Sequence, residues 1–426
     1  MGLFAKLCGY LPSSKREVAV LQESIEKLYA RIERADSGIN GNIDFKRDEF
    51  LLQCNQLYSR IEQADTGING NIDAKRQEFV TYVMPVVREI CDFQYAKAEH
   101  DKQRFSIYME QCFPQDTPAE SRRRLFKMLP DAEGDIRLMQ LANAKLMHEL
   151  DRICTQEKLP YWLTYGSLVG TLSRDGFIPW DDDIDICMMR SDVAKLISAC
   201  KRNADYQITV VYDYYAKCKQ IRFSSRNSDI PCFIDVSIYD WCLSCDERSD
   251  DLLRSSRLQF MNECESLIPE LDYWKSNPYL FAPGSGYVPQ CAEVNPEKQD
   301  PHLAQLTIDV IESIFDKYYE SANKAGIISA SKVDAVGVAY SIENVYDAPW
   351  RRIIWPKEMI YPVSKHAFEL YEFCVPNQAD RVADECYPGW PYLPKDILGH
   401  EHFSKELLKR ESVRHALLSL VGFQEK

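Results

Sequence analysis

Aspartates are concentrated in one short stretch of this sequence. Four of them fall within five positions, namely Asp181, Asp182, Asp183 and Asp185. If this stretch forms a strand, its period of two places Asp183 and Asp185 on one face and the neighbouring isoleucines on the other. Two adjacent carboxylates repel each other unless a cation lies between them, and such oxygen ligands suit Mg²⁺ or Mn²⁺. The stretch therefore predicts a divalent-metal site.

A third carboxylate comes from a second expected strand. Asp235 lies within the alternating segment FIDVSI at 233–238, and three aspartates around one or two divalent ions are typical of phosphoryl transfer. The dipeptide Gly166-Ser167 ends an earlier β-prone segment, where a glycine lets the backbone approach a phosphate. Gly-Ser, an Asp-x-Asp 16 residues later and a lone strand aspartate 50 residues beyond it resemble the pattern of the nucleotidyltransferase fold shared with β-type DNA polymerases.

Phosphate charge that the metal leaves unbalanced requires cationic side chains. Arg174 lies between the Gly-Ser turn and the aspartates and is the first candidate. Lys219 and Arg222, on the strand expected before Asp235, are the second. Arginine binds phosphate with two parallel hydrogen bonds, whereas lysine acts as a point charge. The alternative for each of the three is an ordinary ion pair at the surface.

The segment YWLTYGSLVGTLSRDGFIPWDDDIDI, residues 161–186, resembles the signature of the LicD/fukutin family of phosphotransferases. The stretch from Val375 to His400 resembles the C-terminal pattern of the same family, so the similarity covers roughly residues 140–405. Ser167 stands where the family commonly has a threonine, which keeps the hydroxyl, and Tyr165 stands where a glycine is frequent. The Ile-Pro-Trp-Asp-Asp-Asp-Ile-Asp core is the most specific part of this similarity.

The resemblance implies roles for individual residues. Asp183, Asp185 and Asp235 would be the catalytic, metal-binding carboxylates, with Asp235 as a metal ligand or as the base that accepts the proton of the acceptor hydroxyl. Donor binding would fall to a larger set: Gly166, Ser167, Arg174, Asp181, Lys219, Arg222 and His400.

Family members transfer a phosphorylated alcohol, such as phosphocholine, phosphoglycerol or phosphoribitol, from a CDP-activated donor to a glycan and release CMP. The resemblance implies the same reaction here, on a hydroxyl of a cell-surface glycan or its lipid-linked precursor, in capsule, lipopolysaccharide or teichoic acid synthesis. Two alternatives stay open. One is a true nucleotidyltransferase that adds a nucleoside monophosphate to a small molecule or protein, and the other is an oligomeric scaffold without catalytic activity.

The N-terminal part contains a duplication. Residues 28–51 and 57–80 are identical at 18 of 24 positions with an offset of 29. Apolar residues recur mostly at steps of seven and four, which indicates a helix. The Gly and Asn residues inside each copy are poor in helix interiors, so a long coiled coil and a stack of helical hairpins remain alternatives. Either form buries little surface alone, which predicts a homo-oligomer.

Length and composition bound the remaining possibilities. The chain has 426 residues and a net charge of −14, so it is a poor general binder of nucleic acid. Its 15 scattered cysteines and the lack of a recognisable secretory signal favour a reducing, cytoplasmic location, with peripheral contact of the first eleven residues on the inner face of the membrane left open. We expect a helical arm over 1–85, a helical linker over 86–135, and an α+β domain over 136–426.

The α+β domain is expected to contain a mixed sheet flanked by helices. Strands are expected at 207–213, 219–224 and 233–238, because these segments are β-prone or alternate in polarity. Helices are expected at 136–154, 250–267, 302–324 and 401–420, because apolar residues recur there at helical spacing.

Overall fold

The computed structural model describes residues 107, 111–266, 271–282, 299–345, 352–386 and 405–422. These described residues fall into two units, which divide between Leu125 and Phe126. The predicted helical arm with its two repeats, the first part of the predicted linker, and His400 lie outside the described residues. The sheet and every other predicted site residue belong to the second unit.

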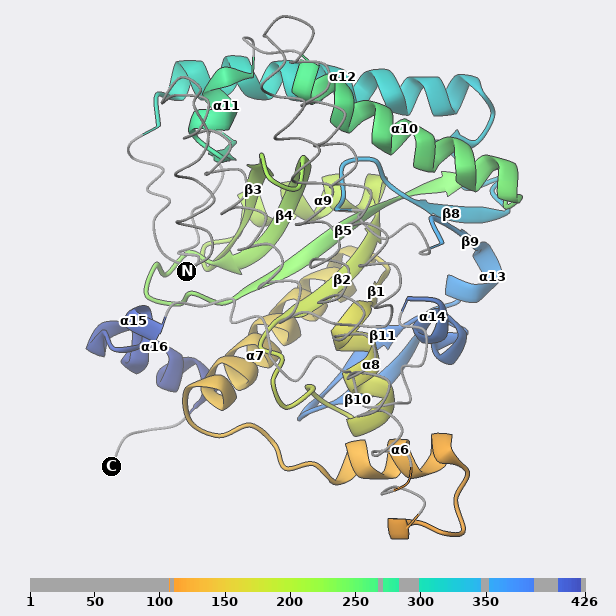
Figure 1. The fold of residues 1–426 in the computed structure, drawn as a ribbon. Helices are drawn as coiled ribbons and strands as arrows, with labels where there is room; N and C mark the ends of the chain where they lie inside the picture. The colour runs from red at the N-terminus through yellow and green to blue at the C-terminus, as the bar shows by residue number, and fades with distance from the viewer. Residues whose placement is uncertain are drawn as a thin grey trace, which may run out of the picture. The chain divides into compact units, whose positions relative to one another are not determined.

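A mixed sheet forms the centre of the second unit (Figure 1). Its main path runs β1-β2-β5-β4-β3-β6, in which β2 and β5 are parallel and all other neighbours are antiparallel. The strands have these bounds: β1 Tyr161–Leu163, β2 Ile184–Met189, β3 Tyr206–Asp213, β4 Cys218–Ser225, β5 Phe233–Cys242 and β6 Tyr279–Phe281. The three expected strands are thus confirmed, and so is the α+β class.

Three short strands extend the sheet along the C-terminal half of β5. They are β7 Ile328–Ser329, β8 Gly337–Tyr340 and β9 Ile354–Pro356. Strands β7 and β8 pair directly with β5, and β9 pairs with β8. All three pairings are antiparallel. Strand β5 therefore pairs with β2 and β4 in its N-terminal part and with β7 and β8 in its C-terminal part.

One face of the sheet is apolar and carries two helices. Ile184 and Ile186 of β2 and Ile234 and Val236 of β5 point to this face and are at most 4% exposed. The helices α7 (Gly134–Glu157) and α9 (Arg190–Lys201) contact β2 and β5, and Figure 1 shows α7 running behind these strands. The polar residues that alternate with them, among them Asp185 and Asp235, therefore lie on the opposite face.

Two long helices and a short one form a second core with β3 and β6. They are α10 (Glu247–Ser266), α12 (Pro301–Lys324) and α11 (Asp272–Ser276). Phe260, Trp274 and Phe315 are buried at their centre, and the Trp274 indole N–H donates to the carbonyl of Tyr212 at 3.0 Å. The carboxylate of Asp300 accepts from two backbone N–H groups at the start of α12.

Helices α7, α10 and α12 confirm three of the expected helices. The expected final helix is present as two pieces, α15 (Lys405–Leu408) and α16 (Glu411–Val421), in the described part of that range.

The remaining elements are shorter helices and one hairpin. Helix α6 spans Pro118–Met128, and α8 (Tyr165–Arg174) precedes the aspartate-rich loop. The hairpin of β10 (Ser364–Phe368) and β11 (Tyr371–Val375) contacts β1, α7 and α8. The short α13 (Lys357–Ile360) contacts α14 (Ala379–Cys386), which in turn contacts α8. In the described ranges no helix combines the length and apolar character that crossing a bilayer requires.

Candidate active site

The loop that carries the aspartates is fixed by two buried amide side chains of α7. Gln140 donates to the carbonyl oxygens of Ile178 at 3.1 Å and Asp181 at 2.8 Å. Asn143 donates to the carbonyl oxygen of Asp182 at 2.6 Å. Both amides are at most 3% exposed, and the N–H groups of a buried side chain hold their acceptors firmly because no water competes for them. The backbone under the aspartates is therefore positioned by the helix.

The tip of the β10–β11 hairpin holds the other end of this loop. Glu369 forms two hydrogen bonds with the Arg137 guanidinium, at 2.9 and 2.6 Å, and the Phe177 N–H donates to the same carboxylate at 3.3 Å. A Cβ at Gly176 would lie 2.6 Å from Glu369 Oε1, so only glycine permits this approach. The Glu369 carboxylate raises the pKa of Arg137, chiefly through their hydrogen bonds. A charged pair thus clamps the loop to α7.

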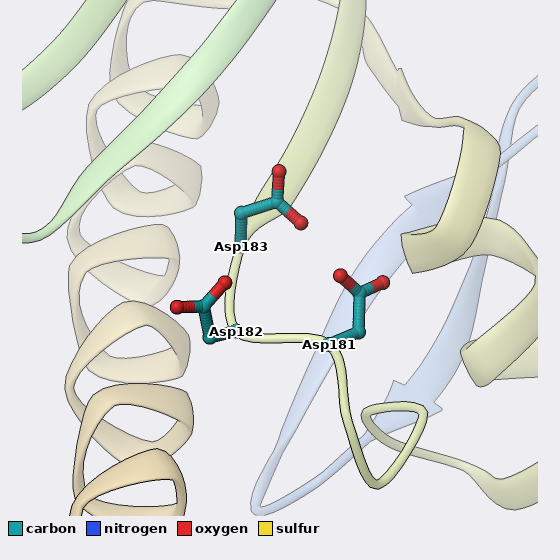
Figure 2. Close-up of side chains that lie close together, drawn as sticks. All are labelled: Asp181, Asp182 and Asp183. Atoms are coloured by element: carbon teal, nitrogen blue, oxygen red, sulfur yellow. The ribbon is translucent and has the colours of Figure 1, made fainter. Parts of the chain in front are cut away.

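Three carboxylates gather in the loop itself. Figure 2 shows Asp181 and Asp183 directing their side chains to the same side, while Asp182 turns toward a helix on the other side. One ligand atom of each residue lies within 4.8 Å of the others, and among the described residues this is the one such group of three or more His, Cys, Asp or Glu. The carboxylate of Asp182 is buried, whereas those of its two neighbours are half-buried. A set of only oxygen ligands suits a hard divalent cation.

Asp185 and Asp235 form a second pair, on the sheet. They are register partners on the parallel strands β2 and β5, so their side chains lie on the same face about 4.8 Å apart in strand spacing. The expected alternation is present, because Ile184 and Ile186 point to the apolar face. The structure therefore brings Asp185 and Asp235 together as predicted from the pattern.

Asp183 lies where the aspartate loop joins strand β2. The strand begins at Ile184, so Asp183 precedes the pleated part of the chain and is not bound by its alternation. Its carboxylate belongs with those of Asp181 and Asp182 in the loop group. Asp183 thus belongs to the loop group and lies two residues from Asp185 of the strand pair, and the metal site of Asp183, Asp185 and Asp235 stays a prediction.

Arg222 is the cation of the strand pair. It is the register partner of Asp235 on β4, and its Nε lies 2.7 Å from Asp235 Oδ1. The guanidinium carbon lies 4.3 Å from the ring centroid of Phe233, which limits its movement. Arg222 is 8% exposed and Asp235 28%, and Arg222 Nη1 has no hydrogen-bond partner within the described ranges. One nitrogen of a buried cation therefore lacks a partner among the described residues beside the carboxylates.

Gly166 and Ser167 lie directly against the carboxylates at the start of α8. A Cβ at Gly166 would lie 2.3 Å from Asp181 Oδ2, so the carboxylate occupies the space that any other side chain would need. The Ser167 hydroxyl accepts the Asp185 N–H at 2.9 Å, and the Thr164 N–H donates to the Asp185 carbonyl at 3.1 Å. The glycine and the serine thus position the two aspartate groups relative to each other.

Arg174 lies away from this cluster. Its guanidinium donates to the carbonyl of Leu129 at 2.8 Å and to Asp131 at 2.9 Å, and also to the carbonyl of Phe126. Arg174 ends α8, whereas Ser167 lies near its start, about 10 Å away along the helix at 1.5 Å per residue. The arginine is therefore bonded to α6 and to the segment after it, in the kind of ion pair named as its alternative, and its role in donor binding stays a prediction.

Lys219 also lies elsewhere. It is three positions from Arg222 on β4, so strand alternation places the two on opposite faces of the sheet. Its ammonium pairs with Glu312 of α12 at 2.8 Å. Lys219 therefore forms the ion pair named as its alternative and lies on the other face of the sheet from Arg222, and its role in donor binding stays a prediction.

Sequence reasoning does not single out four residues that support the site, namely Arg137, Gln140, Asn143 and Glu369. The first three recur every third position along α7, so they share one face of that helix. That spacing of polar residues inside an amphipathic helix is a signal that could have found them. Glu369 is 232 residues from Arg137, and no local sequence pattern predicts a partner at that distance.

The sheet, the paired strand carboxylates and the glycine-serine helix start all lie in a part of the chain that is similar to known proteins. Residues 158–241 match the family model described as LicD/FKTN/FKRP, nucleotidyltransferase domain. Over these residues the chain is similar to the LicD family, as its motif predicted.

Two relatives show how far the similarity extends. The lipopolysaccharide cholinephosphotransferase LicD of Haemophilus influenzae is 27% identical over 117 residues, which are 25% of this chain and 44% of that protein. An uncharacterised protein of Rickettsia prowazekii is 32% identical over 77 residues, 18% of this chain and 29% of that protein. The chain thus spans less than half the length of each of these relatives.

Proposed function

We propose that this protein transfers a phosphorylated alcohol from a CDP-activated donor to a hydroxyl of a cell-surface glycan, in a reaction that requires a divalent metal. The observation that carries the proposal is the row of Asp185, Asp235 and Arg222 on three neighbouring strands. Two carboxylates and an available guanidinium N–H are the groups that a phosphate held by a metal requires. The name of the Haemophilus influenzae relative, a cholinephosphotransferase acting on lipopolysaccharide, supports phosphotransfer to a glycan.

The donor set fits Mg²⁺ or Mn²⁺. Two ligands on opposite sides of an octahedral Mg²⁺ are about 4.2 Å apart, since each bond is about 2.1 Å. The ligand atoms of Asp181, Asp182 and Asp183 lie within 4.8 Å of one another, so a small closure would let them share one ion. Asp185 and Asp235 would hold a second. When bound, the metal would neutralise negative charge on the phosphate oxygens.

Residues of the chain would bind the phosphate, accept the proton and position the carboxylates. Arg222 Nη1 would donate to a phosphate oxygen, because this N–H is buried beside Asp235 and unpartnered within the described residues. Asp235 would accept the proton of the acceptor hydroxyl as its oxygen attacks the phosphorus that bears the alcohol. The bond from that phosphorus to the CMP oxygen breaks, and CMP leaves with the bonding electron pair. Gly166 and Ser167 would keep the loop and strand carboxylates in place during this exchange.

The wider setting follows from the same proposal. The domain would have the nucleotidyltransferase fold, since its matched residues carry that description in the family model. We place the reaction in the cytoplasm, with a lipid-linked glycan acceptor and with the N-terminal repeats as an oligomerisation arm.

A donor panel tests the function. Purified protein would be incubated with Mg²⁺ or Mn²⁺ and with CDP-choline, CDP-ethanolamine, CDP-glycerol, CDP-ribitol, ATP and UTP. We expect metal-dependent release of CMP from at least one CDP-alcohol, with loss of more than about 100-fold in the Asp185→Asn variant because a metal ligand is removed. Asp251→Asn is the matched control, since Asp251 is exposed on α10.

Two other results would replace the proposal. Release of pyrophosphate from ATP or UTP, with the nucleotide attached to an acceptor, would assign a true nucleotidyltransferase. No turnover of any donor by folded protein, together with an unchanged phenotype of Asp185→Asn in cells, would assign a scaffold.

A further inference from the structure

Buried polar atoms without partners are concentrated on one patch of the sheet. Nine side-chain nitrogen or oxygen atoms in the described ranges are buried and lack a hydrogen-bond partner. Four of the nine come from neighbouring positions of β3 and β4: Thr209 Oγ1, Gln220 Oε1, Arg222 Nη1 and Ser224 Oγ. Thr209, Ser224 and Arg222 are all buried. We call these four residues the polar strip.

The polar strip continues the row of site carboxylates. Thr209 is the register partner of Arg222, and Arg222 that of Asp235. Gln220 and Ser224 are two positions from Arg222 in either direction, so strand alternation puts them on the same face. At about 4.8 Å per strand, Thr209 lies about 14 Å from Asp185 across the sheet. The strip therefore begins at the phosphate-binding N–H of Arg222 and extends away from the aspartates.

The chemistry of the strip indicates its ligand. Leaving a buried donor or acceptor unpaired is costly, so native proteins rarely collect such groups without a partner for them. The two hydroxyls both donate and accept, the Gln220 oxygen accepts, and the Arg222 N–H donates. A group with several hydroxyls satisfies all of them. A quaternary ammonium satisfies none and would bring a positive charge next to Arg222.

We propose that the polar strip binds a hydroxyl-rich group, a polyol or a sugar, attached to the phosphate that reacts beside Asp235. This inference rests on the proposed function and narrows its substrate class. The hydroxyls belong either to the alcohol of the donor or to the ribose of its nucleotide, which share this chemistry. In the first case the protein selects phosphoglycerol- or phosphoribitol-type donors over phosphocholine-type donors.

Two variants of the full chain test the strip, Thr209→Val and Ser224→Ala. Each removes a hydroxyl without a partner within the described residues and nearly keeps the side-chain volume. The control is Thr307→Val, because Thr307 on α12 is also buried but its hydroxyl donates to the Leu303 carbonyl at 2.8 Å. The measurements are the thermal unfolding midpoint and, by titration calorimetry with Mg²⁺ and no acceptor, the Kd for CDP-ribitol, CDP-glycerol, CDP-choline and CMP.

We expect Thr209→Val and Ser224→Ala to keep or raise the unfolding midpoint and to weaken CDP-ribitol and CDP-glycerol binding about three- to tenfold, the loss of one net hydrogen bond. The control should lower the midpoint and leave every Kd unchanged. If CDP-choline and CMP keep wild-type affinity in the two variants, the strip binds the alcohol. If all four probes weaken equally, it binds the ribose.

Two results would overturn the inference. One is wild-type affinity of both variants for all four probes. The other is a lowered midpoint with unchanged affinity, which would give the hydroxyls a purely structural role. Failure of the proposed function is visible separately, because the wild-type protein would then release no CMP from any CDP-alcohol. Wild-type protein that binds none of the four probes would overturn both.

Discussion

Glu369 allows a direct test of how the aspartate loop is held. Replacing Glu369 by Gln keeps the shape of the side chain and one acceptor oxygen but removes the charge that pairs with Arg137. The two side chains are 12% and 24% exposed. Exposed pairs contribute at most about 1 kcal/mol, and breaking a buried pair costs about 3–5 kcal/mol. We therefore expect Glu369→Gln to lower the free energy of unfolding by about 2 kcal/mol.

The same change should impair activity, because the loop it releases carries the carboxylates. A shift of about 1 Å at a reacting group costs up to 100-fold in rate, so we expect at least about a tenfold fall in CMP release and a higher Mg²⁺ requirement. Urea unfolding measures the first effect and a Mg²⁺ titration of CMP release the second. Glu320→Gln is the control, since the Lys324–Glu320 pair is 79% and 64% exposed and should contribute less than about 0.5 kcal/mol.

The double variant Arg137→Met/Glu369→Gln completes the test. If the pair acts as a unit, the second substitution should add little to the first, because the partner charge is already gone. Additive losses of stability would refute the clamp. Loss of stability with unchanged Mg²⁺ dependence would show that the hairpin supports the fold and does not position the aspartates.

Further predictions concern single positions. Gly166→Ala should reduce CMP release while the protein stays folded by circular dichroism, because the new Cβ would lie 2.3 Å from Asp181 Oδ2. Arg222→Met should raise the KM for the donor more than Lys219→Met does in the same kinetic assay, because only Arg222 lies beside Asp235. Asp213→Asn should raise the unfolding midpoint at pH 7 but not at pH 3. Burial raises the pKa of Asp213. The wild-type protein therefore loses stability as the pH rises through that pKa, because a buried carboxylate becomes charged, whereas the Asp213→Asn variant has no such group.

Local patterns were sufficient to predict strands β3, β4 and β5 and the alternation around the strand carboxylates. Alternation around Asp185 and Asp235 follows from the pleat and from the isoleucines beside them, and the parallel register of β2 and β5 then brings the two together. The same rule separates Lys219 from Arg222, because an odd offset changes the face of the strand. Strand alternation alone is therefore enough to place Lys219 and Arg222 on opposite faces of the sheet.

Other features depend on partners that are distant in the sequence. Arg174 could only be placed by its contacts with Leu129 and Asp131, because its type and position fit a phosphate ligand equally well. The role of Glu369 could not be predicted from the sequence for the same reason, since its partner Arg137 lies in a different element. The charge of a side chain predicts which ligands it can bind. The tertiary fold decides whether another protein group already pairs with that charge.

This distinction is the reason that Arg222 carries more weight than the other predicted cations. The Arg174 guanidinium donates to three protein oxygens, and its Nε, which also lacks a partner among the described residues, lies away from the strand carboxylates. Lys219 is paired with Glu312 on the opposite face of the sheet. Arg222 donates its Nε–H to Asp235, and its Nη1 is buried without a partner among the described residues. Burying part of a guanidinium without a partner is unfavourable, and an incoming phosphate oxygen would remove that cost. Its position next to the reacting carboxylates therefore has a physical reason that does not depend on the family resemblance.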